Sequence, residues 1–327
     1  MVDPRSLQEN LKIGVVGVGA WGRNHIRVLK SLGVTISAIC DVNEERARRV
    51  AREYGVEKYY VSLDEMIGRE DLDAVTICTP SITHAECAVK ALEVGLHTFV
   101  EKPLASSIDG CIKIIDAMNS SNRIVMTGFI ERFNPAVRKA VELLETDEIG
   151  DVLMIHGRRI GWWPERVGDV GVVKDTAIHD IDLTRFILKK DPMQVYARGG
   201  RLFHELEDHV QAILSFENGL KAAFIEANWL TPRKKREMEL TGSGGVISIK
   251  FLTQEVSLEK ADMVIEPIVK QEEPLKLELQ HFIECVSNGR RPMVDALDGL
   301  KAVAIAEAIL QSMETGKVVD INLKSII

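Results

Sequence analysis

The segment from Asp175 to Asp182 carries one histidine among three acidic residues. On a helix, Asp175 and His179 share a face because they are four residues apart. A histidine titrates near neutral pH and can take the proton of a hydroxyl group, while a carboxylate one turn away can orient the imidazole or hold a substrate. The alternative is structural, with Asp175 as a helix N-cap and His179 as a hydrogen-bonded core residue. Because the segment has no second histidine, we expect no metal site.

A second candidate is Lys102, within the tripeptide Glu101-Lys102-Pro103 that follows an apolar run. A lysine at the carboxyl end of a buried strand projects into the crevice where ligands of such sheets bind. Its ammonium group can there hold a hydroxyl or carbonyl oxygen of a substrate. The alternative is a solvated lysine that precedes a loop stiffened by proline.

The chain also carries the pattern G-x-G-x-x-G at Gly17, Gly19 and Gly22, directly after an apolar run that starts at Lys12. The first glycine allows a tight turn, the second lets the backbone approach a pyrophosphate, and the third lets the next helix pack closely on the strand. Asp41 ends the second apolar run, roughly 20 residues past the glycines, where an acid hydrogen-bonds a ribose 2′-hydroxyl. This context predicts a dinucleotide site rather than a glycine turn before a packed helix. Arg46, Arg48 and Arg49, farther along, are expected to be solvated.

These residues require a parallel sheet to position them. Strand-like runs end at Gly17, Asp41, Cys78 and Glu101, and another spans 124–127; helical patterns over 44–54, 63–67, 84–94 and 108–119 alternate with them. Such alternation predicts a parallel sheet with helices on both faces and ligands at the carboxyl ends of the strands. The residues expected to bind the cofactor are therefore Gly17, Gly19, Ala20, Trp21, Gly22, Asp41, Thr79, Pro80, His84, Glu101 and Lys102.

After about residue 128 the pattern changes. Helices are predicted over 135–144 and 176–188, strands over 195–198, 210–216, 221–227, 238–241 and 246–250, and closing helices over 277–287 and 296–313. Asn218-Gly219 between two of these strands predicts a hairpin turn. The sequence therefore predicts an α/β protein with a doubly wound dinucleotide-binding domain at 1–128. A second, α+β domain with a large antiparallel sheet is predicted at 129–327.

Composition limits the remaining possibilities. The chain has 327 residues, 46% hydrophobic content and a net charge of -8, which argues against a basic footprint for nucleic acid. The five cysteines form no C-x-x-C pair, which favours reduced thiols. Neither an apolar signal core behind Asp3, Pro4 and Arg5 nor an 18-residue apolar stretch occurs, so we expect a cytoplasmic protein without membrane contact.

Taken together, the glycine pattern, Glu101-Lys102-Pro103 and the pair Asp175/His179 resemble the Gfo/Idh/MocA oxidoreductase family in order and spacing over essentially the whole chain. The resemblance implies a Rossmann domain that binds NAD, followed by an open-sheet domain whose outer face forms a homodimer or homotetramer. It also implies that Lys102, Asp175 and His179 are the catalytic residues, and that the Lys102–Pro103 bond is cis. The implied activity is the oxidation of a secondary hydroxyl group of a sugar or sugar derivative.

Two further segments resemble a subgroup, the UDP-N-acetylglucosamine 3-dehydrogenases: 130–135, with Glu131, Arg132 and Asn134, and 169–182. Trp162-Trp163 and Lys174 depart from that pattern. The resemblance suggests carbon 3 of a nucleotide sugar as the reacting centre, with a diphosphate held by cationic side chains. The candidates for that contact are Arg132, Arg158, Arg159 and Arg233.

Residues expected to bind the substrate are Arg132, Asn134, Trp163 and His179. Arg132 and Asn134 also fit a loop and helix cap, Trp162-Trp163-Pro164 a packed corner, and 233–236 a solvated hairpin. A free polyol or inositol-type dehydrogenase remains the alternative function. A protein that senses NAD(H) without turnover is disfavoured because the sequence shows no DNA-binding or partner module.

Overall fold

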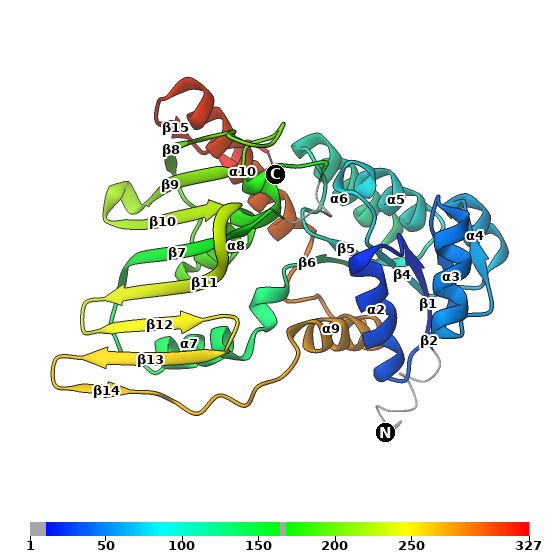
Figure 1. Ribbon diagram of the computed structural model, residues 1–327, viewed down its shortest axis with the longest axis horizontal. Helices are drawn as coiled ribbons and strands as arrows, with labels where there is room; N and C mark the ends of the chain where they lie inside the picture. The colour runs from blue at the N-terminus through cyan, green and yellow to red at the C-terminus, as the bar shows by residue number, and fades with distance from the viewer. Residues whose placement is uncertain (1–10, 164–167, 327) are drawn as a thin grey trace. The chain divides into compact units, whose positions relative to one another are not determined.

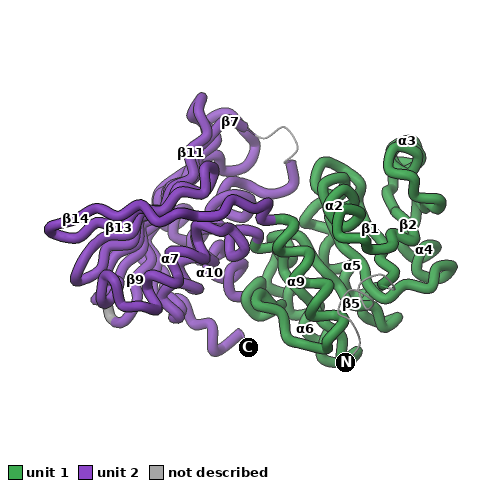
Figure 2. Tube along the Cα trace, turned by 90° about the horizontal axis from the view of Figure 1, so that it is seen from below, with its two compact units in different colours: residues 1–129, 275–300 green, residues 130–274, 301–327 purple. Residues whose placement is uncertain are grey.

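The computed structural model describes residues 11–163 and 168–326, which form two compact units. Figure 1 shows the elements along the chain, and Figure 2 shows the two units in different colours. Unit 1 holds the described residues up to Phe129 together with Leu275–Leu300. Unit 2 holds Ile130–Pro274 and the described residues from Lys301 on. Residues 1–10, with Asp3, Pro4 and Arg5, and Pro164 lie outside the described residues.

Unit 1 is a six-stranded parallel sheet in the order β3-β2-β1-β4-β5-β6, as expected for a doubly wound fold. Its strands are β1 (Lys12–Val16), β2 (Thr35–Cys40), β3 (Tyr59–Tyr60), β4 (Ala74–Ile77), β5 (His97–Glu101) and β6 (Val125–Gly128). Its helices are α2 (Ala20–Ser31), α3 (Glu44–Tyr54), α4 (Leu63–Arg69), α5 (Ser81–Glu93), α6 (Ile108–Ser121) and α9 (Pro274–Asn288).

Local signals set the ends of these elements. The side chain of Asn43 accepts a hydrogen bond from the backbone N–H of Arg46 at the start of α3, and Ser107 caps α6 in the same way through Gly110. Helix α3 ends at Gly55, whose φ of 62° suits a left-handed C-cap. The helix predicted over 84–94 corresponds to α5, which begins three residues earlier, at Ser81.

The segment Leu275–Leu300 departs from the sequence-based division at residues 128 and 129. Phe282 of α9 packs edge-on against Phe99 of β5, with ring centroids 5.6 Å apart. The hydroxyl group of Thr127 donates to the carbonyl oxygen of Asp295, and Met126 forms a bridge with the same residue. These contacts attach a segment from the second half of the chain to the parallel sheet.

Unit 2 is built on a nine-stranded sheet in the order β14-β13-β12-β11-β7-β10-β9-β8-β15. Among the described strands of this sheet, only β7 and β10 pair in parallel, and the other pairs are antiparallel. The strands are β7 (Val152–Trp162), β8 (Gln194–Gly200), β9 (His209–Phe216), β10 (Lys221–Asn228), β11 (Leu230–Gly242), β12 (Val246–Lys250), β13 (Glu255–Lys260), β14 (Met263–Ile265) and β15 (Val319–Asp320). The helices and turns are η1 (Ile130–Phe133), α7 (Pro135–Glu145), η2 (Val173–Ala177), α8 (Ile178–Leu188), η3 (Glu217–Gly219), α10 (Ala296–Thr315) and η4 (Leu323–Ser325).

One face of the large sheet is packed under helices. Along β9, Val210, Ala212, Leu214 and Phe216 are buried, and they alternate with more exposed residues, as a half-buried strand requires. Helix α8 contacts β7 and β10, while α7 contacts β12 and β13 (Figure 1). On the other face, exposed apolar side chains such as Phe224 remain. The expected homodimer or homotetramer through this sheet stays a prediction.

The sequence missed the centre of this sheet. Strand β7 lies between β10 and β11 but was not predicted, and β11 is longer than the predicted 238–241. The Asn218-Gly219 hairpin is confirmed, since β9 and β10 pair directly around η3.

All five cysteines are thiols, and burial raises the pKa of Cys40 to about 12. No helix within 11–163 or 168–326 is both long and apolar enough to cross a membrane.

Two glycines at the start of α2 give a matched test of the local packing. A Cβ added at Gly22 would overlap the carbonyl oxygen of Gly17, whereas one added at Gly19 would have no heavy atom within 4 Å. We expect Gly22→Ala to lower the free energy of unfolding by about 1–3 kcal/mol, and Gly19→Ala to leave it nearly unchanged. Thermal unfolding of both variants measures this. Equal melting temperatures for the two would contradict the packing described.

Candidate functional site

The glycine turn of unit 1 forms an open cradle. Gly17 has a φ of 82°, and a Cβ there would lie 2.7 Å from the backbone nitrogen of Thr79. Space is open at Gly19, and α2 begins at Ala20 and Trp21 with no side-chain cap from the described residues. The first N–H groups of the helix therefore remain available for an anion, which is the arrangement that a dinucleotide pyrophosphate uses. The cradle fits NAD.

Asp41 directly follows β2 and supports this turn. Its carboxylate accepts hydrogen bonds from the backbone N–H groups of Val18 (3.0 Å) and Asn43 (2.9 Å). The guanidinium of Arg46 lies 3.3 Å from the same carboxylate. Arg46 was expected to be solvated, and its side chain is indeed partly exposed, but the structure pairs it with Asp41. This contact was not predicted because it depends on where α3 begins. Asn43 caps the helix, and Arg46 in its first turn lies beside Asp41.

His84 braces two strand ends. It is buried, and its ring nitrogens lie 2.8 Å from the carbonyl oxygen of Pro103 and 2.9 Å from that of Thr79. Thr79 is half-buried and Pro80 is exposed at the same edge. Contact of these three residues with a cofactor stays a prediction. The geometry itself gives His84 a role in fixing the loop that carries Lys102.

The loop after β5 holds Lys102 through its neighbours. The Lys102–Pro103 peptide is cis. Glu101 is directed inward, with one carboxylate oxygen 2.9 Å from Nε2 of the buried His25 on α2, and the other accepting from the backbone N–H of Lys102. His25 was not predicted as a site residue, although its place three residues after Gly22 puts it on the buried face of the same helix.

In unit 2, Asp175 and His179 lie around an irregular turn. Residues Val173–Ala177 form a π-helical turn that runs directly into α8, so Asp175 is not the helix N-cap that the structural alternative required. Such turns are frequent at functional sites. Asp175 is buried and His179 is half-buried.

A hydrogen-bond relay reaches Asp175 from the sheet. The indole N–H of Trp229 donates to the hydroxyl group of Thr176 (2.9 Å), which in turn donates to the carboxylate of Asp175 (3.2 Å). Trp229 packs edge-on against Trp163, whose ring is stacked on His204 with centroids 3.5 Å apart. Trp163 therefore belongs to an aromatic cluster beside this relay. Trp229 and His204 have no spacing signal in the sequence, because the sheet and a loop bring them together.

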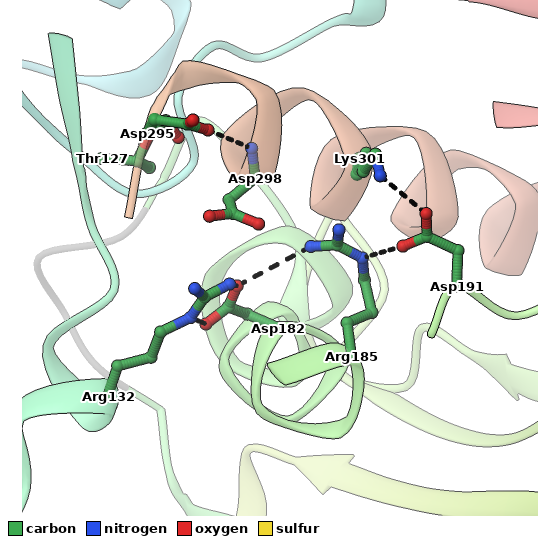
Figure 3. Close-up of polar contacts among 8 residues, drawn as sticks. All are labelled: Thr127, Arg132, Asp182, Arg185, Asp191, Asp295, Asp298 and Lys301. Atoms are coloured by element: carbon green, nitrogen blue, oxygen red, sulfur yellow. Dashed lines mark hydrogen bonds and ion pairs between the residues drawn. The ribbon is translucent and has the colours of Figure 1, made fainter. Parts of the chain in front are cut away.

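The four arginines expected at a diphosphate have different surroundings. Arg132 is buried and forms a bidentate pair with Asp182, at 2.7 and 2.5 Å (Figure 3). Arg158 lies 2.9 Å from the carboxylate of Glu226. Arg159 is buried and donates to Asp180 (2.6 Å) and Glu131 (2.7 Å). Arg233 is exposed on β11.

Glu131 and Asn134 belong to the same buried cluster. The amide of Asn134 donates to Glu131 (3.0 Å), and its oxygen accepts from the N–H of Ala136 at the start of α7. Burial alone would raise the pKa of the Glu131 carboxyl, but Arg159, Arg236 and the hydrogen bond from Asn134 together outweigh burial and lower this pKa. Asn134 therefore acts as the helix cap that the sequence offered as an alternative. Substrate contacts by Arg132 and Asn134 stay predictions that this geometry does not favour.

No group of three or more His, Cys, Asp or Glu residues suited to a metal ion occurs in the described part of the chain. Within unit 1, the structure gathers Gly17–Gly22, Asp41, Thr79 and Lys102 at strand ends of one sheet. Within unit 2, it gathers Asp175, Thr176, Trp229 and Trp163.

Comparisons with known proteins agree with this arrangement. Residues 11–129 match the model of the oxidoreductase family with an NAD-binding Rossmann fold, and residues 137–248 match the GFO/IDH/MocA C-terminal domain. The chain is 29% identical to inositol 2-dehydrogenase 3 of Saccharopolyspora erythraea over 96% of each chain. It is 30% identical to scyllo-inositol 2-dehydrogenase (NAD(+)) of Bacillus subtilis, over 97% of this chain and 98% of the relative.

Among solved structures, UDP-N-acetylglucosamine 3-dehydrogenase from Acidithiobacillus ferrooxidans superposes with a TM-score of 0.85 at 25% identity, over 93% of this chain and 98% of that one. The family matches cover more than half of the chain and fall on both units. The glycine cradle and the lysine loop lie within the first matched range, and the Asp175/His179 segment lies within the second. The chain belongs to the Gfo/Idh/MocA family and is an NAD-dependent oxidoreductase that acts on CH–OH groups.

Proposed function

We propose that the protein oxidises a secondary hydroxyl group of a free polyol or monosaccharide, with an inositol-type ring as the first candidate. The observation that supports this choice is the pairing of three candidate arginines with carboxylates of the protein. Arg132, Arg158 and Arg159 each pair with a carboxylate, so they do not offer the uncompensated positive charge that a nucleotide diphosphate requires. An uncharged ring needs no such partner. The two inositol dehydrogenase relatives support the same choice.

In this proposal, the residues of the chain divide the chemistry among them. The glycine turn and Asp41 would hold NAD, which would supply the acceptor for the hydride of the carbinol carbon. His179 accepts the hydroxyl proton on its imidazole, and the ammonium group of Lys102 donates a hydrogen bond to the same oxygen and stabilises its developing negative charge. Asp175, held by Thr176, orients the substrate or the imidazole.

The nucleotide-sugar alternative has its own support. The structural likeness to UDP-N-acetylglucosamine 3-dehydrogenase is high, and the segments 130–135 and 169–182 resemble that subgroup. Those segments, however, supply the buried pairs described above. We therefore rank carbon 3 of a nucleotide sugar second, and a sensor without turnover third.

The first prediction concerns cofactor choice. The Asp41 carboxylate should repel a 2′-phosphate, so NAD should bind at least about tenfold more tightly than NADP, worth roughly 1.4 kcal/mol. Because Arg46 lies beside Asp41, Asp41→Ala should release a cation for the phosphate and reduce this preference. Arg46→Ala, the matched control, should preserve or widen it. Fluorescence titration of both cofactors measures the preference, and equal or tighter NADP binding by the unmodified protein would refute the assignment.

The second prediction concerns the proposed catalytic residues. Lys102→Met and His179→Asn should reduce turnover by about a hundredfold or more, the scale for losing an acid–base group. Their NAD affinity should stay within a few-fold, because the glycine turn and Asp41 provide most cofactor contacts. The controls Lys139→Met and His156→Asn alter exposed or half-exposed side chains and should leave turnover unchanged. Near-normal turnover in either test variant would remove that residue from the mechanism.

The third prediction concerns the substrate. Inositols, free hexoses and UDP-sugars are compared by initial NADH formation, with a carbonyl trap to draw the reaction forward. We expect activity on at least one inositol or hexose and none above background on UDP-sugars, because Arg132, Arg158 and Arg159 are already paired with carboxylates. Activity on a UDP-sugar alone would reverse the ranking of the two proposals.

A further inference from the structure

Two sequence segments have no part in the proposed chemistry, although both carry charged residues that are buried. Glu131 and Arg132 lie in η1, and Asp180 and Asp182 lie in α8, one and three residues after His179. All four belong to unit 2. Their contacts show that η1 and α8 are joined to each other by charge at two points.

The first connection runs through β7. The Nε atom of Arg159 donates to Asp180, and its Nη1 atom donates to Glu131. Asp180 is 0% exposed and Arg159 is 1% exposed, and the guanidinium also stacks over the ring of Phe251 with a separation of 4.5 Å. Gly157 of β7 makes room for this carboxylate, since a Cβ there would lie 3.1 Å from it.

The second connection is direct. Arg132 of η1 donates two parallel hydrogen bonds to the carboxylate of Asp182. This bidentate geometry fixes the orientation of the two side chains relative to each other. Asp182 also lies 4.0 Å from Arg185, which donates to Asp191, and Asp191 accepts from Lys301 of α10. Figure 3 shows this chain of contacts from Arg132 to Lys301. It extends the attachment of α8 from η1 to α10.

The start of α8 lacks a side-chain cap. It follows the π-helical turn at once, and its N-cap position is Ala177. Asp180 and Asp182, two residues apart, leave the helix on roughly opposite sides. A rotation or a slide of the first turn would therefore lengthen at least one of the two connections. His179 lies directly before them.

We propose that Asp180 and Asp182 are positioning residues, which act through Arg159 and Arg132 to hold His179 in the orientation needed for proton transfer. The inference rests on the proposed role of His179 as the proton acceptor. It assigns the Glu131-Arg132 and Asp180-Ile181-Asp182 segments to the support of the catalytic helix rather than to a substrate phosphate. Buried ion pairs contribute little to net stability, so the presence of two such pairs here is consistent with a role in orienting α8.

The test separates geometry from stability by replacing the pair as a whole. Arg132→Met or Asp182→Leu alone removes one side of the bidentate pair, leaves the other charge buried, and should lower the melting temperature. The double variant Arg132→Met/Asp182→Leu removes both charges and should recover most of that loss. It should nevertheless lower kcat by about tenfold or more, with KM for the substrate and Kd for NAD changed less than about threefold.

Two milder variants grade the effect. Arg132→Lys keeps the charge but loses the bidentate grip, and it should give a smaller fall in kcat. Gly157→Ala pushes on Asp180 without altering any charge, and it should also lower kcat. The control double variant Glu148→Leu/Lys260→Met removes an ion pair of unit 2 that does not involve α8, and its kcat should be unchanged.

A readout independent of turnover completes the design. The ring resonances of His179, assigned with the His179→Asn variant, should shift in the Arg132/Asp182 double variant and stay in place in the control. A double variant with recovered melting temperature, unchanged kcat and unchanged His179 resonances would overturn the positioning role. Absence of turnover by the unmodified protein on every polyol and sugar would refute the proposed function, while the resonances would still test whether the ion pairs orient His179.

Discussion

Burial of charge in the first turns of α8 is the constraint on which unit 2 depends. Asp182 is 1% exposed and Asp180 is fully buried, and removing a carboxylate from water costs several kcal/mol unless a partner compensates for it. Arg132 and Arg159 are those partners, and each must be held in turn by its own surroundings. The turn η1, the central strand β7 and the helix α8 are consequently fixed relative to one another by their charges as well as by packing.

The same constraint bears on what the protein can bind. An arginine that already neutralises a buried carboxylate cannot move to a phosphate without leaving that carboxylate alone in the interior. Arg132 and Arg159, two of the four arginines that suggested a nucleotide sugar, are thus part of the framework. What remains around Asp175 is an aromatic cluster with a hydroxyl relay through Thr176, which suits a ring bearing several hydroxyl groups. The paired arginines and the inositol dehydrogenase relatives both support the proposal of an uncharged polyol or monosaccharide as the substrate.

The sequence was sufficient wherever the structure depends on adjacent residues. The glycine turn, Asp41 and the Lys102 loop are local, and their strand-and-helix context is strongly periodic, so the parallel sheet of unit 1 could be predicted, but not the later segment that packs on it. Strand β7 was missed because Gly157, Arg158 and Arg159 break the usual alternation of apolar and polar residues. The interior position of Arg159 is stable only because Asp180 and Glu131, both distant in sequence, meet it there. Attachment of Leu275–Leu300 to unit 1 has the same origin in long-range contacts such as Phe99 with Phe282.

The most direct test of the account is an equilibrium titration of the protein saturated with NADH. Scyllo-inositol, myo-inositol and glucose are titrated separately, each in the absence and the presence of UDP, with binding followed by calorimetry. If the arginines are committed to their carboxylates, at least one of the uncharged rings should bind, and UDP should neither bind measurably nor compete. Binding of UDP with displacement of the ring would contradict the central claim, because it would show that a cationic site for the nucleotide exists.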